Sequence, residues 1–382
     1  MFNKIQNIMK QFLITIVFVL LSISIFSQKE YTFQDVIDIE SSSVKSQGKT
    51  GTCWSFSTSS FIESEIFRLT GEQVDISEMF SVRNTYDDKA WNYVMRQGKT
   101  QFSEGGLAHD VMNSIRDNGL VPEIVFSGVK FEDKIYNHSK IIPEMKHVLD
   151  EFIKNDKDSK YPNWKKETSK ILDVEIGKKP KEFDYEGSSY TPFSFAKKFK
   201  INSNDYVTLT SFTQVPFYTN FVLNIPDNFS NGSMYNLPID ELVFVVTNAL
   251  AKGFTIALDV DVSEKTFSAK YGKAILPKNE EDNLKSMTEI VEESIVSQEY
   301  RQEEFENYNT TDDHLMHIVG IVKDQNENKY FKIKNSWGSN SNRVGNDGYI
   351  YMSLPYFKLK TISVLLHKDG LSKKIKSFLH FN

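Results

Sequence analysis

The chain has 382 residues, 40% of them hydrophobic, and carries 45 Lys and Arg against 51 Asp and Glu, for a formal net charge of −6. This apolar content can bury a large core or two packed lobes, which excludes a disordered protein. The mildly acidic balance gives no broad basic surface, so nucleic acid is not an expected partner.

The first 27 residues have the form of a secretory signal peptide. Lys4 and Lys10 precede an apolar run over residues 12–26, and Ser27 offers a small residue for cleavage. The run is shorter than the roughly 20 residues that a spanning helix needs. We therefore expect cleavage, no stable membrane anchor afterwards, and an exported protein in a periplasmic or extracellular location. The alternative is an uncleaved membrane anchor.

The first third of the chain after this segment is predicted to be mainly helical. A helix is expected over residues 53–70, where apolar side chains recur at helical spacing and Gly71 follows as a stop. Further helices are expected over residues 107–118 and from residue 141 onward. Thr191 and Pro192 predict another helix start, as an N-cap and first-turn pair.

The second half is predicted to be richer in strands. Residues 207–235 look like strands and loops, and a helix follows between Pro238 and Gly253. Residues 256–262 alternate apolar side chains with Asp259 and Asp261, which predicts a strand with one buried face and both carboxylates toward solvent. The remaining expected elements are an acidic helical stretch over 280–306, a hairpin from 314–323 and 329–335, and strands over 348–353 and 361–367. Helices first and strands later predict an α+β protein with two segregated lobes.

Cys53 is the one cysteine of the chain and stands at the start of the first predicted helix. A single cysteine cannot close an intramolecular disulfide, so its position in an exported protein suggests reactivity. A thiol at a helix N-terminus feels the partial positive charge of unpaired backbone N–H groups, which favours the nucleophilic thiolate. The alternative is a buried cysteine that acts as a small hydrophobe.

A cysteine nucleophile needs an imidazole, a group that orients the imidazole, and donors for the oxyanion. Each has a candidate here. Gln47 lies six residues before Cys53 across a glycine-containing loop, and His314 and Asn335 come from the strand-rich half. Such separation along the chain is expected when a site lies in a cleft between two lobes.

These residues stand in segments that resemble the papain-like cysteine peptidases. Residues 44–56, VKSQGKTGTCWSF, look like the active-site segment of that family, and residues 335–338, NSWG, look like its orienting Asn motif. Three shorter matches resemble the bleomycin hydrolase or aminopeptidase C branch: EGG at 104–106, NGLVP at 118–122 and DHLMH at 313–317. The matches are spread over most of residues 35–370.

The resemblance implies a papain-like two-lobe fold with a large insertion, in which residues 28–382 form the peptidase domain. The parts of this domain are expected to be a helical lobe at about 40–122, an insertion at about 123–237, a β-rich lobe at about 238–367 and a C-terminal tail at 368–382. Insertions of this kind build oligomer contacts and restrict the cleft in the bleomycin hydrolase group, which leaves a homo-oligomer open.

The resemblance also implies a role for each site residue. Cys53 would attack the scissile carbonyl, His314 would be general base and then acid, and Asn335 would orient it. Gln47 and the Cys53 N–H would form the oxyanion hole, and Trp337 would shield the His–Asn hydrogen bond from water. The backbone of Gly105 and Gly106 would bind an extended peptide substrate. No metal and no cofactor are expected.

Two histidines compete for the role of base. Side chains alternate along a strand, so His314 and His317 are expected on opposite faces, and one of them can meet Cys53. In the family that this chain resembles, the catalytic histidine is followed by a glycine six residues later. His314 and Gly320 match this spacing, so the resemblance selects His314. His317 is then a partly buried histidine satisfied by a neighbour, and the two rings would not converge on one metal ion.

The function expected from the sequence is a cysteine-type peptidase, most simply an aminopeptidase that hydrolyses short peptides. The alternatives are a secreted papain-like endopeptidase, an acyltransferase that uses an amine acceptor, and a non-catalytic peptide-binding relative. In the bleomycin hydrolase group a C-terminal arm enters the cleft, and its carboxylate binds the free amine of the substrate. Here only residues 368–382 follow the last expected strand.

Overall fold

The computed structural model describes residues 30–129, 135–154, 161–339 and 341–380. The expected signal peptide, residues 1–27, lies outside the described residues. Within the described part of the chain, no helix is long and apolar enough to cross a membrane.

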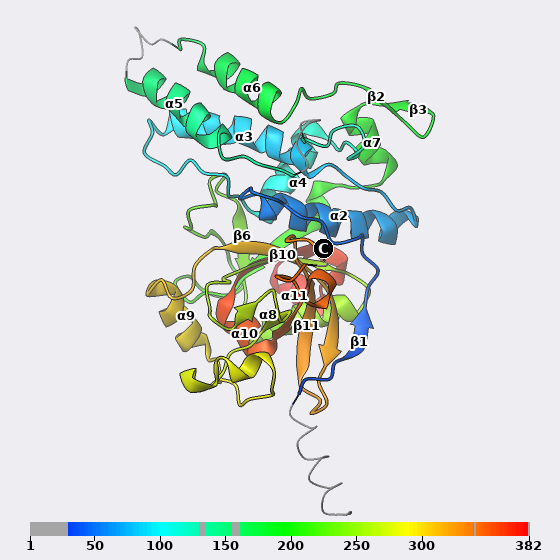
Figure 1. Ribbon diagram of the computed structural model, residues 1–382, viewed down its shortest axis with the longest axis vertical. Coiled ribbons are helices and arrows are strands. Elements are labelled where there is room, and N and C mark those ends of the chain that lie inside the picture. Colours follow the sequence, from blue (N-terminus) through cyan, green and yellow to red (C-terminus); the bar gives the residue numbers. More distant parts are fainter. Residues whose placement is uncertain (1–29, 130–134, 155–160, 340, 381–382) are drawn as a thin grey trace, which may run out of the picture.

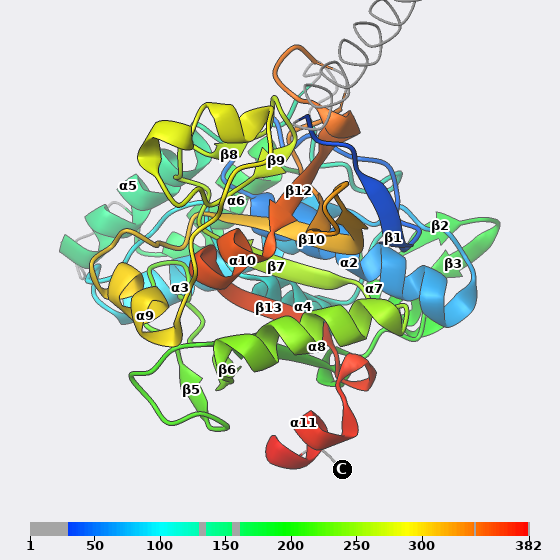
Figure 2. The ribbon, with the colours of Figure 1, turned by 90° about the horizontal axis from the view of Figure 1, so that it is seen from below.

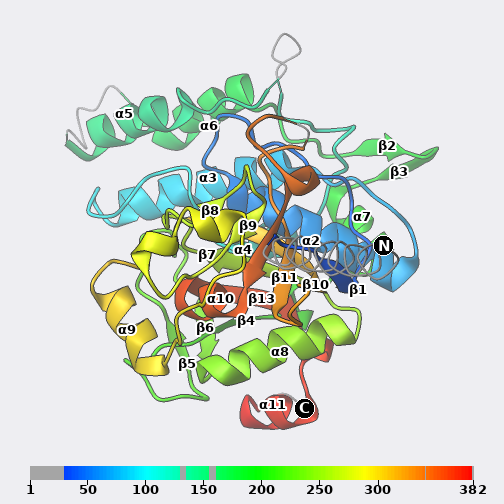
Figure 3. The same ribbon diagram turned by 60° about the horizontal axis from the view of Figure 1, so that its bottom comes forward.

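A large mixed sheet lies between two groups of helices (Figures 1 and 3). The upper group in Figure 1 comes from the first half of the chain. It contains α2 (Cys53–Thr70), α3 (Glu78–Met95), α4 (Ala108–Asn118), α5 (Ile141–Lys154), α6 (Trp164–Glu175) and α7 (Pro192–Lys198), with a small hairpin of β2 (Phe183–Tyr185) and β3 (Ser188–Tyr190). One apolar cluster joins these helices to the face of the sheet that carries Leu315 and Ile362.

The sheet runs in the order β5-β6-β4-β13-β7-β10-β11-β12-β9-β8, and β1 pairs with the end of β10. Its strands are β1 (Gln34–Asp38), β4 (Tyr206–Thr210), β5 (Asn220–Val222), β6 (Ser233–Asn236), β7 (Ile256–Val260), β8 (Phe267–Ser268), β9 (Lys273–Ala274), β10 (His314–Lys323), β11 (Lys329–Lys334), β12 (Tyr349–Ser353) and β13 (Thr361–His367). Strands β10 and β11 form the hairpin expected from the sequence.

The other face of the sheet is covered by a second apolar cluster (Figures 2 and 3). Its helices are α8 (Ile239–Ala251), α10 (Leu354–Lys360) and α11 (Lys373–Phe378), and α9 (Gln298–Glu306) lies at the periphery. The C-terminal segment belongs to this side, because Leu371, Ile375 and Leu379 are buried in the same cluster as the apolar face of α8.

Helix α2 forms the floor of the helical group and packs directly on β10 and β7. All its residues from Cys53 to Ile66 are buried, including a run of Ser and Thr at 57–60. Small polar side chains let both the sheet and α3 approach the helix closely. Gly71 ends the helix with φ +75°, as expected, because glycine adopts the left-handed conformation without a Cβ clash.

Several expectations from the sequence differ from the structure. Strand β7 lies between β13 and β10 and is buried on both faces, so the prediction that Asp259 and Asp261 face solvent is wrong. Asp259 is 2% exposed and Asp261 0%. The stretch at 280–306 is helical over α9, with short 3₁₀ turns before it. Alternation by itself does not distinguish an edge strand from a central strand.

The segment assigned to the insertion, about 123–237, contributes to both layers of the structure. Helices α5, α6 and α7 extend the helical group (Figure 1), whereas β4 pairs with β13 and carries β6 and β5 beyond it. The sheet therefore begins well before the boundary expected at about 238.

Candidate active site

Cys53 is the first residue of α2 and opens on a cleft between the helical group and the sheet. The loop before it is fixed by the insertion, because Lys49 N–H donates to the carbonyl of Tyr136 at 2.8 Å. Gly48 lies under the same carbonyl with φ +63°, and a Cβ there would come within 2.6 Å of the Tyr136 oxygen. Only glycine fits at the point where the loop passes under the Tyr136 carbonyl.

The imidazole of His314 enters the cleft from the start of β10. Its Nε2 lies 2.8 Å from Oδ1 of Asn335, which follows β11. The indole of Trp337 covers the His314 ring at a centroid distance of 4.7 Å and an angle of 33°. The amide oxygen therefore holds one ring nitrogen, and the indole covers the ring on one side.

Gln47 ties the loop before α2 to the segment after Asn335. Its Oε1 accepts from Ser336 Oγ at 2.7 Å, and its backbone N–H donates to the Ser336 carbonyl at 2.9 Å. Its Nε2 donates one hydrogen to the Thr50 carbonyl at 2.7 Å. A carboxamide nitrogen carries two hydrogens, so the second remains for a ligand in the cleft.

The glycine segment expected to bind substrate forms the opposite wall of the cleft. Glu104 anchors it to α2, because its carbonyl accepts from Trp54 Nε1 at 2.9 Å and its Oε2 accepts from Gly51 N–H at 2.5 Å. A Cβ on Gly106 would lie 3.1 Å from the Trp54 ring, so glycine allows this close packing.

The cleft has a volume of about 540 Å³. It is lined by Gln47, Cys53, Gly105, Gly106, His314 and Trp337, and Asn335 lies behind His314. The structure therefore brings together all seven residues that the sequence selected, from segments far apart in the chain.

Burial sets the charge state of the substrate-free site. It raises the pKa of the Cys53 thiol to about 12; a backbone hydrogen bond from Leu315 opposes the shift, and the charges of Asp312, Asp227 and Asp259 add to it. Burial also lowers the pKa of His314 to about 4, against the hydrogen bond to Asn335. Burial therefore opposes, at the Cys53 sulfur, the preference for the thiolate that is expected from the helix terminus.

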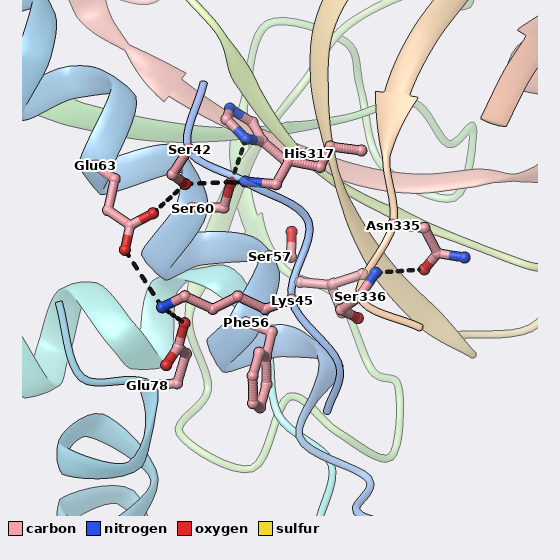
Figure 4. Close-up of a pocket in the computed structure, with 12 residues that line it drawn as sticks. Ser42, Lys45, Phe56, Ser57, Ser60, Glu63, Glu78, His317, Asn335 and Ser336 are labelled. Atoms are coloured by element: carbon pink, nitrogen blue, oxygen red, sulfur yellow. Dashed lines mark hydrogen bonds and ion pairs between the residues drawn. The ribbon is translucent and has the colours of Figure 1, made fainter. Parts of the chain in front are cut away.

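His317 is not part of the cleft. It is fully buried behind α2, where its Nδ1 lies 2.9 Å from Ser60 Oγ (Figure 4). The same pocket holds Lys334, whose Nζ donates to Ser42 and Ser60. This is the structural role expected from the sequence, although the ring is buried completely and not in part.

The sequence reasoning missed a group of acidic residues at the cleft. Asp227, in the loop between β5 and β6, and Asp312, two residues before His314, both line it. Asp259 lies next to Asp312 and was assigned to solvent. Asp312 could have been noticed from its nearness to His314, but Asp227 carries no local signal, because the fold alone brings its loop to Gly105.

The C-terminal tail at 368–382 does not line the cleft with any of its described residues, 368–380. Helix α11 lies beyond α8, on the side of the sheet away from α2 (Figures 2 and 3). The carbonyl of Gly370 accepts from Asn248 Nδ2 at 2.9 Å, and Phe378 packs on Tyr218 with ring centroids 4.8 Å apart. Residues 381–382 lie outside the described residues.

Comparison with known proteins agrees with this geometry. The Peptidase C1-like family matches residues 99–381, and the papain family of cysteine proteases matches residues 34–124. Aminopeptidase G of Lactobacillus delbrueckii subsp. lactis is 21% identical over 387 residues, which cover 90% of this chain and 84% of that protein. Aminopeptidase E of Lactobacillus helveticus is 22% identical over 394 residues, which cover 91% of this chain and 86% of that protein.

A solved structure shows the same fold. PepW from Lactobacillus rhamnosis HN001 matches with a TM-score of 0.70 at 18% sequence identity, over 91% of this chain and 84% of that chain. The first family match spans well over half of the present sequence. The chain therefore belongs to the peptidase C1-like family and is a papain-like cysteine peptidase.

Proposed function

We propose that this peptidase removes N-terminal residues from short peptides by a Cys–His–Asn mechanism. The observation that carries the proposal is the convergence of Cys53, His314 and Gln47 on one cleft, with Asn335 bonded to His314. The aminopeptidase names of the relatives support the choice of an exopeptidase.

The catalytic steps follow from the arrangement of the groups. Nε2 of His314 is engaged by Asn335, so Nδ1 is the nitrogen free to take the proton of the Cys53 thiol. The sulfur then attacks the peptide carbonyl, and the oxyanion receives hydrogen bonds from Gln47 Nε2 and the Cys53 N–H. His314 returns the proton to the leaving amine, and water hydrolyses the thioester by the reverse route.

Burial raises the pKa of the Cys53 thiol in the substrate-free enzyme. In the proposed mechanism His314 opposes this effect, because it takes the proton as the sulfur attacks.

The first test replaces the nucleophile. Cys53→Ala should abolish peptide hydrolysis while the urea unfolding curve stays close to that of the wild type, because a small side chain is exchanged for another. An epoxide directed at thiols should label the wild type and leave the variant unlabelled. Hydrolysis by a correctly folded Cys53→Ala protein would rule out this mechanism.

The second test separates exopeptidase from endopeptidase activity. Peptides are supplied with a free or an acetylated N-terminus, and the products are identified by mass spectrometry. The proposal predicts release of single N-terminal residues from the free peptides only. Equal cleavage of both forms would instead make the enzyme an endopeptidase, and capture of added amine in the product would make it an acyltransferase.

We also infer export, from the apolar run that ends near Ser27. The check is N-terminal sequencing of the protein from fractionated cells. A mature chain that begins shortly after Ser27, outside the cytoplasm, is the expected result, and an intact N-terminus in the cytoplasm would contradict it.

A further inference from the structure

The cleft contains carboxylates that the catalytic roles do not use. Asp227 lies directly against the glycine wall: a Cβ on Gly105 would come within 1.9 Å of Asp227 Oδ2. Its Oδ1 is held by Gln101 Nε2 at 3.1 Å and by Ser103 Oγ at 3.5 Å. The Asp227 carboxylate therefore has a fixed position, with Oδ2 on the strip along which an extended substrate would run.

Asp312 contacts the same loop and a second buried acid. Its carboxylate accepts a hydrogen bond from the backbone of Asp227 and shares a hydrogen bond with the carboxyl group of Asp259, whose side chain is 2% exposed. Two carboxyl groups that share one proton keep a negative charge in a site that largely excludes water, and a cationic ligand would stabilise that charge.

The charge of Lys89 acts on Asp227 and partly opposes the rise of its pKa, but these two described side chains form no ion pair. Lys89 is 3% exposed, its Nζ donates to the carbonyl of Gly105, and it lies over the Phe229 ring at 5.0 Å. Among the described residues it makes no ion pair with Asp227 or Asp312. No group of three or more His, Cys, Asp or Glu in the described part of the chain is placed to hold a metal ion.

We propose that Asp227 and Asp312 bind the α-ammonium group of the substrate's N-terminal residue. The inference rests on the proposed function and adds the groups that select a free N-terminus. In this chain they would take the role that the arm carboxylate has in the bleomycin hydrolase group, since the described part of the C-terminal tail lies on the far side of the sheet.

The distance between the charged nitrogen and the reacting carbonyl distinguishes the α-ammonium from other cations. In a peptide the α-nitrogen is joined through a single Cα to the carbonyl carbon that the sulfur attacks. Asp227 and Asp312 line the same cleft as Cys53, and their charges act on its thiol, so a group bound to them shares this cleft with the reacting carbonyl. A Lys or Arg side chain would carry its charge several bonds farther away. Asp227 Oδ2 also fills the space directly beside the Cα of Gly105.

Binding of an ammonium group would also act on the nucleophile. The charges of Asp312 and Asp227 disfavour the Cys53 thiolate, and a bound cation compensates them. A substrate with a free amine then favours formation of the thiolate that attacks it. An acetylated peptide carries no such charge, so the negative charges of the carboxylates continue to disfavour the thiolate.

The decisive variant is Asp227→Asn, which keeps the acceptor for Gln101 and removes the charge. With leucine p-nitroanilide, kcat/KM should fall about 10- to 100-fold, mainly through KM, as expected for loss of a charge-assisted hydrogen bond. Cleavage of the N-acetyl compound should not decrease. Asp184→Asn makes the same chemical change at an exposed site on β2 and should behave as the wild type.

A measurement on the wild type gives an independent readout. Isoamylamine should compete with leucine p-nitroanilide, whereas isoamyl alcohol should not. Asp227→Asn should lose the effect of the amine. A chain that ends at His380 carries its C-terminal carboxylate two residues earlier and should keep the effect, as expected if that carboxylate does not bind the amine.

The outcomes separate the two proposals. The proposed amine-binding site is wrong if Asp227→Asn keeps the wild-type preference for free amines, or if amine and alcohol compete equally. In either case a wild-type preference for free amines would still support the proposed aminopeptidase activity. If the wild type cleaves free and acetylated substrates equally, the aminopeptidase itself is wrong. If cleavage of acetylated lysyl peptides depends on Asp227, its carboxylate binds a cationic side chain of the substrate. That result would overturn the proposal that it binds the α-ammonium group.

Discussion

His314 and His317 lie on the same strand, and their surroundings give the two rings different chemistry. His314 opens on the cleft, and Asn335 fixes its Nε2. His317 is enclosed between α2 and the sheet, bonded to Ser60, and burial together with the nearby charge of Lys334 lowers its pKa well below the ordinary value. An imidazole without access to the cleft cannot exchange a proton with the substrate.

This difference predicts a clear ranking of two alanine variants. His314→Ala should lower kcat/KM by about 10²–10⁴-fold, the range for loss of a general acid–base group, with little change in the free energy of unfolding. His317→Ala should keep most of the activity and lose about 1–3 kcal/mol of stability, because it removes a buried hydrogen-bonded ring. Steady-state kinetics and urea unfolding of both variants make the comparison; the reverse ranking would assign the base to His317.

The loop that leads into α2 shows how separate elements position one functional group. Gln47 is fixed by Ser336 after β11, while Lys49 is held by Tyr136 of the insertion. Gly48, between them, passes under the Tyr136 carbonyl in the left-handed conformation. The placement of the Gln47 amide therefore depends on a crossing that admits no side chain.

Two glycine substitutions test this crossing. Gly48→Ala places a Cβ 2.6 Å from the Tyr136 oxygen, so the loop must shift, and displacement of the Gln47 donor should lower kcat by about 10²-fold. Gly71→Ala is the matched control: its φ is +75°, but no atom lies within 4 Å of the added Cβ. Both variants should lose about 1 kcal/mol of stability from the backbone conformation, and kinetics should show the loss of kcat in Gly48→Ala alone. Equal kcat values would show that the loop tolerates the shift.

At the scale of the whole molecule, a buried polar network links the helical group to the sheet (Figure 4). Lys45 lies 2.6 Å from Glu78 of α3 and 3.6 Å from Glu63 of α2. Ser42 bonds to both Glu63 and Lys334, and so connects these helices to β11. Burial raises the pKa of Glu78 to about 7, in spite of the opposing charge of Lys45, and raises that of Glu63. The two lobes are thus joined partly by charges whose balance depends on pH.

Lys45→Met removes the cation that this network shares. Without Lys45 the pKa of each buried glutamate rises further, so at pH 8 each must either stay ionised without this cation or take up a proton. Both cost free energy, and we expect a loss of about 3–5 kcal/mol in the free energy of unfolding. Because their pKa values lie above the unfolded-state values, the folded state gains protons as the pH falls, and the loss should shrink toward pH 5. Urea unfolding of variant and wild type at both pH values checks this.

An exposed pair provides the control for this variant. Lys278 is 55% exposed and pairs with Glu292, so Lys278→Met should change stability by less than about 1 kcal/mol at either pH. A loss in Lys45→Met that is the same at pH 5 and pH 8 would show that packing, and not uncompensated charge, causes the effect.

Local signals explain why much of this molecule could be predicted. Gly71 ends α2 and Thr191 caps α7 as expected, because caps depend on a few neighbouring residues. The hairpin of β10 and β11 likewise follows from alternation and a polar turn. The residues expected at the site lay in short motifs around Cys53 and Asn335, so they could be selected without coordinates.

Burial and long-range pairing decided the rest. Asp259 looked like the solvent side of a strand, and it became a buried partner of Asp312 because β7 lies in the middle of the sheet. Asp227 came to the cleft because strands distant in sequence bring its loop to Gly105. The thiol of Cys53 lies at a helix end that favours its ionised form, and burial between the packed lobes opposes this by raising its pKa. Helix ends and motifs are set by neighbours along the chain, whereas solvent access and local charge depend on which distant segments pack together.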